Sequence, residues 1–289
     1  MNIPQEAFDW YDEYAHGDID RRTFLRRLGT LTVAGLSIGS LTAALTPNYA
    51  EAAQVSFNDP DLKPSFKTFS SPDGHGEGRG YLVEPVNNLH PQAAILVVHE
   101  NRGLNPYVKD VARRAAKAGF LAFAPDALHP VGGYPGNDDE GRKMQRSLDR
   151  SKIEQDFIAA ANFLNTFSEV KNVGAVGFCF GGYIVNFLAA QPNQVIAAGV
   201  PYYGTPAATE LWPNIKAPLL VQLAELDKRV NASWPGYEKA LKAQQANFKM
   251  EMYQGCQHGF HNDSTSRYNP DAADASWLST LSHFKKHLA

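Results

Sequence analysis

Apolar runs alternate with amphipathic segments along most of the chain. Continuous apolar runs at residues 94–98, 173–176 and 218–224 predict buried parallel strands, and residues 248–253 predict a shorter strand. Residues 107–118, 153–167 and 271–288 carry apolar side chains at helical spacing, which predicts helices. This alternation predicts a single α/β domain over residues 53–289, with helices on both faces of a mostly parallel sheet.

A sharp turn is predicted directly after one of these strands. The sequence Gly177-Phe178-Cys179-Phe180-Gly181-Gly182 separates the run at 173–176 from a helix-like segment at 183–190. This is the G-x-S-x-G elbow of α/β-hydrolases with cysteine in place of serine. Glycine permits such a turn, and the helix N-terminus favours a thiolate over a thiol. Taken alone, the motif is equally consistent with a buried structural cysteine.

Two later residues complete a set in the order nucleophile, acid, base. Asp227 follows the run at 218–224, and His258 lies in a glycine-flanked loop after the strand at 248–253. The carboxyl ends of neighbouring parallel strands meet at one edge of a sheet, so these residues are expected to converge. We therefore predict a triad of Cys179, Asp227 and His258.

Over about residues 66–287 the sequence resembles the dienelactone hydrolase family. Four separated motifs carry the resemblance: His99-Glu100-Asn101-Arg102-Gly103, the cysteine elbow, Glu225-Leu226-Asp227 and His258-Gly259-Phe260. The resemblance implies an α/β-hydrolase fold and a carboxymethylenebutenolidase-like hydrolase that needs no cofactor.

The resemblance also assigns roles to individual residues. It implies that Glu100 contacts the nucleophilic cysteine, whereas an exposed loop carboxylate is the alternative interpretation of this residue. It further implies an oxyanion hole made by the backbone N–H groups of Phe180 and Asn101.

One position departs from the family pattern and bears on the substrate. Family members that cleave dienelactone have an arginine four residues beyond the catalytic histidine, where this chain has Asn262. We therefore expect little discrimination between anionic and neutral substrates, unless Arg102 replaces the missing cation at the mouth of the site rather than being merely solvated. In the long loop at 129–139, His129 and Tyr134 are candidates to line the pocket.

The charge balance argues against a nucleic-acid partner. The 289-residue chain has 27 basic and 30 acidic residues, of which residues 1–52 hold 4 and 7, so the remainder has 23 of each and no basic run. The two cysteines are Cys179 and Cys256. We interpret Cys256 as a small packed residue near the site, with regulatory pairing to Cys179 as the alternative.

The first 52 residues have the layout of a twin-arginine export signal. Arg21 and Arg22 precede an apolar segment at 28–45, and Ala50-Glu51-Ala52 is an A-x-A cleavage site. This predicts a periplasmic or secreted enzyme that begins near Ala53, uses the twin-arginine export machinery and has no stable membrane span in its mature form. Because residues 1–20 are acidic and aromatic, a helical arm on a cytoplasmic protein is the alternative.

Three classes of function are compatible with these residues. The leading one is hydrolysis of small esters, lactones or enol-lactones through a cysteine nucleophile and an acyl-enzyme intermediate. A thiol-based redox sensor or a non-catalytic binding protein on the same fold is the second, although a sensor has no need of Asp227 and His258 in triad order. A metal site made by His99, His129, His258 and His261 with Asp227 is the third, and no H-x-x-x-H spacing supports it.

Overall fold

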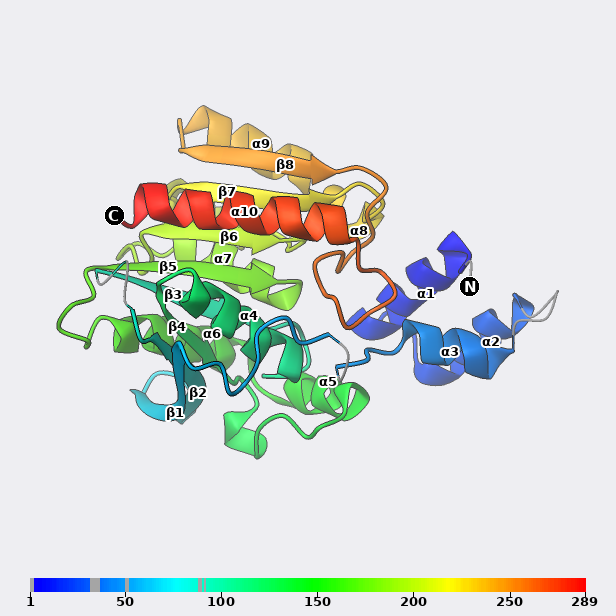
Figure 1. Ribbon diagram of the computed structural model, residues 1–289. Coiled ribbons are helices and arrows are strands. Elements are labelled where there is room, and N and C mark those ends of the chain that lie inside the picture. The colour runs from blue at the N-terminus through cyan, green and yellow to red at the C-terminus, as the bar shows by residue number, and fades with distance from the viewer. Residues whose placement is uncertain (1–2, 32–36, 50–51, 88–89, 91) are drawn as a thin grey trace.

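An eight-stranded sheet forms the centre of the computed structural model, which describes residues 3–31, 37–49, 52–87, 90 and 92–289 (Figure 1). The strand order across the sheet is β1-β2-β4-β3-β5-β6-β7-β8. The strands are β1 (Leu62–Ser71), β2 (Gly76–Pro85), β3 (Ala93–Val98), β4 (Leu121–Pro125), β5 (Asn172–Phe178), β6 (Ala198–Tyr202), β7 (Leu219–Ala224) and β8 (Phe248–Tyr253).

The direction of the strands determines where a site can form. β2 is antiparallel to both β1 and β4, whereas every neighbouring pair from β4 to β8 is parallel. The carboxyl ends of β3, β5, β6, β7 and β8 therefore meet at one edge of the sheet, where open α/β sheets bind their ligands. This is an α/β-hydrolase type of fold, as predicted.

Helices cover both faces of the sheet. α6 (Arg150–Leu164), α7 (Phe180–Ala189) and α9 (Trp234–Ala243) pack on one face, and α4 (Pro106–Lys117) and α10 (Pro270–His287) pack on the other (Figure 1). Alternate residues of β3 point to the two cores: Leu96 to the first and Val97 to the second. Burial on both sides explains why this strand is a continuous apolar run.

The predicted loop at 129–139 is shorter and more ordered than expected. A 3-10 turn, η1 (His129–Val131), is followed by the helix α5 (Asp138–Ser147), which Asn137 caps by accepting a hydrogen bond from the Glu140 N–H at 3.1 Å. α5 is polar along most of its length, so it lacks the apolar periodicity that predicts a helix. A Cβ atom at Gly141 would lie 2.4 Å from the Arg102 carbonyl oxygen, so glycine lets α5 pack closely against the loop after β3.

An N-terminal arm, residues 3–49, lies at the carboxyl edge of the sheet. It contains α1 (Gln5–His16), α2 (Arg21–Thr30) and α3 (Ile38–Leu45), with α1 beside the loops that follow the strands (Figure 1). The arm has a small apolar core of its own, to which Tyr11, Phe24 and Leu28 contribute. Two further short elements complete the fold: η2 (Thr209–Asn214) and α8 (Lys228–Asn231).

Part of the predicted export signal lies outside the described residues. This applies to residues 32–36 of the apolar segment and to residues 50–51 of the predicted cleavage site. Arg21 begins α2, where its Nε lies 3.8 Å from Oδ2 of Asp139. Within the described parts of the chain, every helix is too short or too polar to cross a membrane.

Candidate active site

Cys179 stands at the turn between β5 and α7. Its backbone φ is 58°, a left-handed value that residues other than glycine rarely adopt and that marks a strained, functional position. A Cβ atom on Gly177 would lie 2.2 Å from the Gly181 carbonyl oxygen, and one on Gly181 would lie 2.3 Å from the Val98 carbonyl oxygen. Glycine is therefore required at both positions for the turn to present Cys179 at the N-terminus of α7.

Asp227 and His258 form a buried pair beside this turn. Asp227 follows β7, and its Oδ2 lies 2.5 Å from Nδ1 of His258, which is in the loop after β8. Burial opposes both pKa shifts, yet His258 lowers the pKa of Asp227, and Asp12, Asp227 and Cys179 raise the pKa of His258 to about 10. Asp227 thus fixes the His258 ring so that the proton on Nδ1 points to the carboxylate and Nε2 points away from it.

The Cys179 thiol faces two imidazole rings. The sulfur lies 3.3 Å from Nε2 of His16, and Sγ and one ring nitrogen from each of His16 and His258 all lie within 4.8 Å of one another. Burial alone would raise the pKa of the thiol, but His16 and His258 lower it well below its ordinary value. These two rings therefore favour the thiolate form of Cys179, which is the nucleophilic form of cysteine.

His16 is the site residue that sequence reasoning missed. It is the last residue of α1, in the segment that was predicted to be a removable leader. A local signal for it exists: Asp12 and His16 are four residues apart on the helix, and Gly17 ends the helix in a left-handed conformation with φ 88°. Nothing local indicates that this helix end would reach a cysteine 163 residues later in the chain.

Glu100 is buried directly after β3 and has two polar partners, one of them a cation. Its Oε2 accepts a hydrogen bond from Nδ2 of Asn262 at 3.0 Å and lies 3.3 Å from Nη2 of Arg102. Burial raises the pKa of Glu100, although Arg102 acts in the opposite direction. Glu100 is 1% exposed, so the exposed loop carboxylate considered above is wrong. Its described polar contacts go to Asn262 and Arg102.

Arg102 does not supply a cation at the mouth of the site, contrary to expectation. It is 2% exposed and also pairs with Asp138, whose Oδ2 lies 2.8 Å from its Nη1. Tyr134 donates a hydrogen bond from its hydroxyl to the same Asp138 at 2.9 Å, and Nε2 of His129 lies 3.4 Å from Glu77. Arg102 and Tyr134 thus hold α5 through Asp138, Asn262 holds Glu100 in the loop after β3, and His129 contacts β2, where Glu77 lies.

The two residues predicted to form the oxyanion hole, Phe180 and Asn101, both line the cavity beside Cys179. Phe180 is the first residue of α7, where the N–H has no partner within the helix, and it lines the same cavity as Asn101 and Cys179. The side chain of Asn101 is occupied elsewhere, since its Nδ2 donates to the Ala15 carbonyl oxygen at 2.7 Å. That bond ties the loop after β3 to the end of α1.

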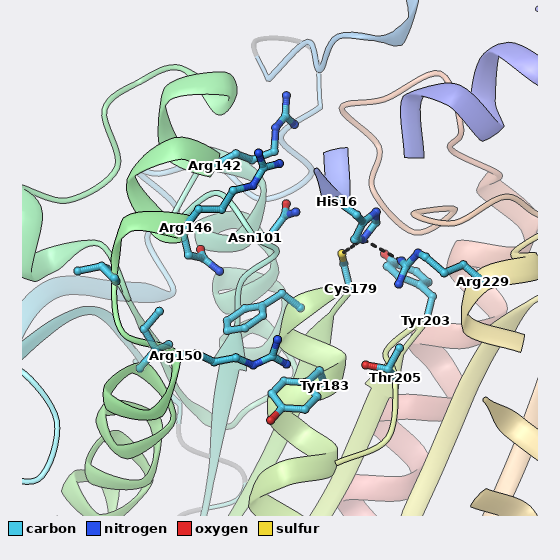
Figure 2. A pocket seen from close by; sticks show the side chains of 14 residues that line it. His16, Asn101, Arg142, Arg146, Arg150, Cys179, Tyr183, Tyr203, Thr205 and Arg229 are labelled. Atoms are coloured by element: carbon cyan, nitrogen blue, oxygen red, sulfur yellow. Dashed lines mark hydrogen bonds between the residues drawn. The ribbon is translucent and has the colours of Figure 1, made fainter. Parts of the chain in front are cut away.

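Four arginines line the cavity above Cys179, and three of them, Arg142, Arg150 and Arg229, are each paired with a carboxylate outside the lining. The cavity encloses about 310 Å³, and Figure 2 shows Arg142 and Arg146 on one side of Cys179 and Arg229 on the other. Its described lining includes no carboxylate; the lining residues are His16, Asn101, Arg142, Gln145, Arg146, Leu148, Arg150, Ile153, Cys179, Phe180, Tyr183, Tyr203, Thr205 and Arg229. Four buried polar atoms on this lining have no hydrogen-bond partner among the described residues: Asn101 Oδ1, Arg142 Nη1, Gln145 Oε1 and the Tyr203 hydroxyl oxygen. Such atoms are the ones a polar ligand satisfies.

Two of the histidines considered as metal ligands make hydrogen-bond contacts with other groups of the protein. His99 accepts a hydrogen bond from the Ala127 N–H, and Nδ1 of His261 is 2.7 Å from the Tyr107 hydroxyl. The described side chains with ligand atoms close enough for a metal form two sets around the thiol and the acid: His16, Cys179 and His258, and Asp12, Asp227 and His258. Neither Cys179 nor Cys256 forms a disulfide in the described structure, and Cys256 is buried, as expected of a packed residue.

Comparison with known proteins gives family matches to two parts of the chain. The dienelactone hydrolase family model matches residues 79–288, and a YqhI-like model matches residues 1–33. Over 105 residues the chain is 60% identical to a protein of Escherichia coli strain K12 named as a hydrolase fragment, YghX, and this covers 36% of the chain and 90% of that protein. Over 245 residues it is 30% identical to a Synechocystis protein named as a carboxymethylenebutenolidase, which covers 79% of the chain and 98% of that protein.

A solved structure supports the fold. The dienelactone hydrolase-like promiscuous phosphotriesterase P91, from metagenomic libraries, superposes with a TM-score of 0.68 at 22% identity, over 78% of this chain and 99% of that one. At this identity the similarity bears on the fold alone. With the family match over residues 79–288, the chain belongs to the dienelactone hydrolase family.

Proposed function

We propose that the protein hydrolyses small esters or lactones that carry a negative charge, with Cys179 as the nucleophile. The observation that carries this proposal is the convergence of Cys179, His258 and Asp227 at the carboxyl edge of the sheet, with the His258–Asp227 pair at 2.5 Å. A redox sensor would need only the reactive thiol, whereas an oriented imidazole is what acyl transfer requires.

The thiolate first attacks the carbonyl carbon of the substrate. The developing charge on the carbonyl oxygen is stabilised by the N–H groups of Phe180 and Asn101. The carbon–oxygen bond to the leaving group then breaks, and the leaving oxygen takes a proton from Nε2 of His258. This leaves a thioester on Cys179 and a neutral imidazole that Asp227 holds in place.

Water completes the reaction on the same residues. Neutral His258 takes a proton from water, and the hydroxide attacks the thioester carbonyl. The carbon–sulfur bond breaks, which releases the carboxylic acid and restores the Cys179 thiolate and the His258 imidazolium. Thus one proton passes from His258 to the leaving group and one returns to it from water.

The cavity supports an anionic substrate, against the expectation from Asn262. Arg142, Arg146, Arg150 and Arg229 line it, and Arg142 Nη1 is buried without a partner among the described residues. An arginine fork is well suited to a carboxylate, because two parallel N–H groups can bind its two oxygens. The positive charge therefore comes from α5, the start of α6 and α8 rather than from the loop that carries Asn262.

Replacement of the nucleophile tests the proposal. We expect Cys179→Ala to abolish hydrolysis of an activated ester such as a nitrophenyl acetate while the fold is retained. Cys179→Ser should be a poor enzyme, because a hydroxyl depends far more on base activation than a thiol does. If Cys179→Ala kept more than a few per cent of the wild-type kcat/KM, the assignment of the nucleophile would be wrong.

A further inference from the structure

His16 places a second imidazole on the sulfur atom of Cys179. Its Nε2 lies 3.3 Å from Sγ, and its ring meets that of His258 edge to face, with ring centroids 5.2 Å apart. Figure 2 shows His16 entering the site from α1, on the side of the cavity where Arg229 lies. The thiol is thus approached by one histidine from the hydrolase domain and one from the N-terminal arm.

Asp12 in the arm orients His16 much as Asp227, which follows β7, orients His258. Nδ1 of His16 lies 2.8 Å from the Asp12 carbonyl oxygen and 3.3 Å from Asp12 Oδ1, so its proton is held on Nδ1 and Nε2 faces the sulfur. Burial alone would lower the pKa of His16, but Cys179 and Asp12 raise it to about 9. The negative end of the α1 dipole favours the charged ring as well.

Several contacts hold α1 against the hydrolase domain. Asn101 binds the Ala15 carbonyl oxygen at 2.7 Å, and the guanidinium of Arg267 lies 5.0 Å from the centre of the Tyr11 ring. At the other end of the helix, Nε2 of Gln5 donates to Gln257 Oε1 at 3.0 Å. His16 is therefore fixed in the site from both ends of its helix.

Other charged or titratable side chains face the sulfur of Cys179 and the ring of His16. They come from each element packed around these two residues. They are Asp12 on α1, Glu100 after β3, Tyr203 after β6, Asp227 and Arg229 at α8, and His258 and Arg267 in the segment between β8 and α10. Arg229 competes for the same nitrogen, since its Nη2 lies 2.8 Å from His16 Nε2. Nε2 serves one contact at a time: it donates to the thiolate when the ring is charged, and accepts from Arg229 when the ring is neutral.

We propose that His16 is a catalytic residue of this enzyme, which takes the thiol proton of Cys179 and holds the resulting thiolate before substrate arrives. The S–H bond of Cys179 breaks, its proton forms an N–H bond at Nε2 of His16, and the sulfur keeps the electron pair. His258 then remains available for the leaving group and for water. This inference rests on the proposed function, because it assigns the activation of the same nucleophile.

The test compares two substitutions of His16 in the full-length protein. His16→Gln keeps a hydrogen-bonding side chain but cannot become a cation, and His16→Ala leaves a space that imidazole from solution can fill. We expect both variants to lose about a hundredfold in kcat/KM for a nitrophenyl ester at pH 7, within the range of one proton-transfer group. We also expect the acidic limb of each variant's profile of kcat/KM against pH to shift to higher pH by about one unit or more, because the pKa of a thiol rises when a nearby cation is lost. Added imidazole should restore part of the activity of His16→Ala and none of that of His16→Gln.

The outcomes separate this proposal from its alternatives. Glu6→Ala, an exposed change on the same helix, is the matched control and should retain wild-type kinetics. Wild-type or higher activity in His16→Gln would overturn the proposal, and higher activity would identify α1 as an inhibitory plug. A uniform loss without a pH shift or imidazole rescue would also overturn it, because that is the result of a purely structural role. If Cys179→Ala is inactive while His16→Gln is normal, only this inference fails and the proposed function stands.

Discussion

The hydrolase domain and the N-terminal arm contribute to one site in different ways. The domain presents Cys179, Asp227 and His258 at the ends of β5, β7 and β8, so their convergence follows from the topology of the sheet. The arm presents His16 from the end of a helix that is held by side-chain contacts on the surface of the domain. The family match over residues 79–288 contains the first set and omits the second. The family match therefore accounts for Cys179, Asp227 and His258, but not for every residue that contacts the sulfur.

The first way to break this comparison is to loosen the arm and leave the domain intact. Phe24 is 2% exposed in the core of the arm, where its ring stacks on Tyr14 with centroids 5.1 Å apart. We expect Phe24→Ala to destabilise the arm by about 3 kcal/mol or more, as is usual for a buried aromatic truncated to alanine. Amides of α1 should then exchange with solvent faster, and kcat/KM should fall toward that of His16→Gln.

The control for this variant is the exchange of the domain itself. Amides of β5 and α7 should keep wild-type protection, because the core of the arm is separate from the two cores of the sheet. Wild-type activity with an unprotected α1 would show that the arm is dispensable for catalysis.

A smaller effect is expected from the charge of the cavity. The Arg150 guanidinium lies 4.1 Å from the centre of the Tyr183 ring at the cavity wall, and the side chain is 60% exposed. Because exposed charges interact weakly, we expect Arg150→Ala to lower kcat/KM by only about threefold for a carboxylate-bearing ester. Turnover of a neutral ester of the same shape should not change, and an equal loss on both esters would contradict an anionic substrate.

The predicted export signal remains a prediction. It is incompatible with a catalytic role of His16 in the mature protein. Cleavage near Ala53 would remove α1 and His16 from the mature enzyme. Replacement of Arg21 and Arg22 by lysines should trap an uncleaved precursor if the signal is used. An intact mass of the native protein that includes residues 1–52 would instead favour the retained arm.

The sheet and the positions of Cys179, Asp227 and His258 at the ends of its strands could be predicted because each depends on local patterns. The run at residues 94–98 became β3 (Ala93–Val98), and the elbow, the acid and the base each follow a strand in the expected order. Residue types and chain order are local information, whereas contacts between distant loops are not. Arg102 illustrates the limit: nothing near it in sequence shows that Asp138 would pair with it and bury it.

The arm and the cavity could not be predicted for the same reason. The apolar segment at 28–45 and the arginine pair fit an export signal, and the contacts that hold α1 come from Asn101, Gln257 and Arg267 far along the chain. The arginines of the cavity lie on the polar helix α5, at the start of α6 and on α8, each as an ordinary charged residue in its own segment. Only the packing of these helices around Cys179 brings them to one cavity.

The central claim is that histidines from both regions hold Cys179 as a thiolate. The most direct test is the rate of Cys179 alkylation by iodoacetamide, followed from pH 4 to 10 by mass spectrometry in wild type, His16→Gln and His258→Gln. The account predicts that wild type is alkylated at a nearly constant rate well below the ordinary thiol pKa of about 8.5, and that each variant moves the midpoint of the profile to higher pH. A His16→Gln profile that coincides with wild type, while His258→Gln shifts, would show that the thiolate depends on the hydrolase domain alone and would contradict the account.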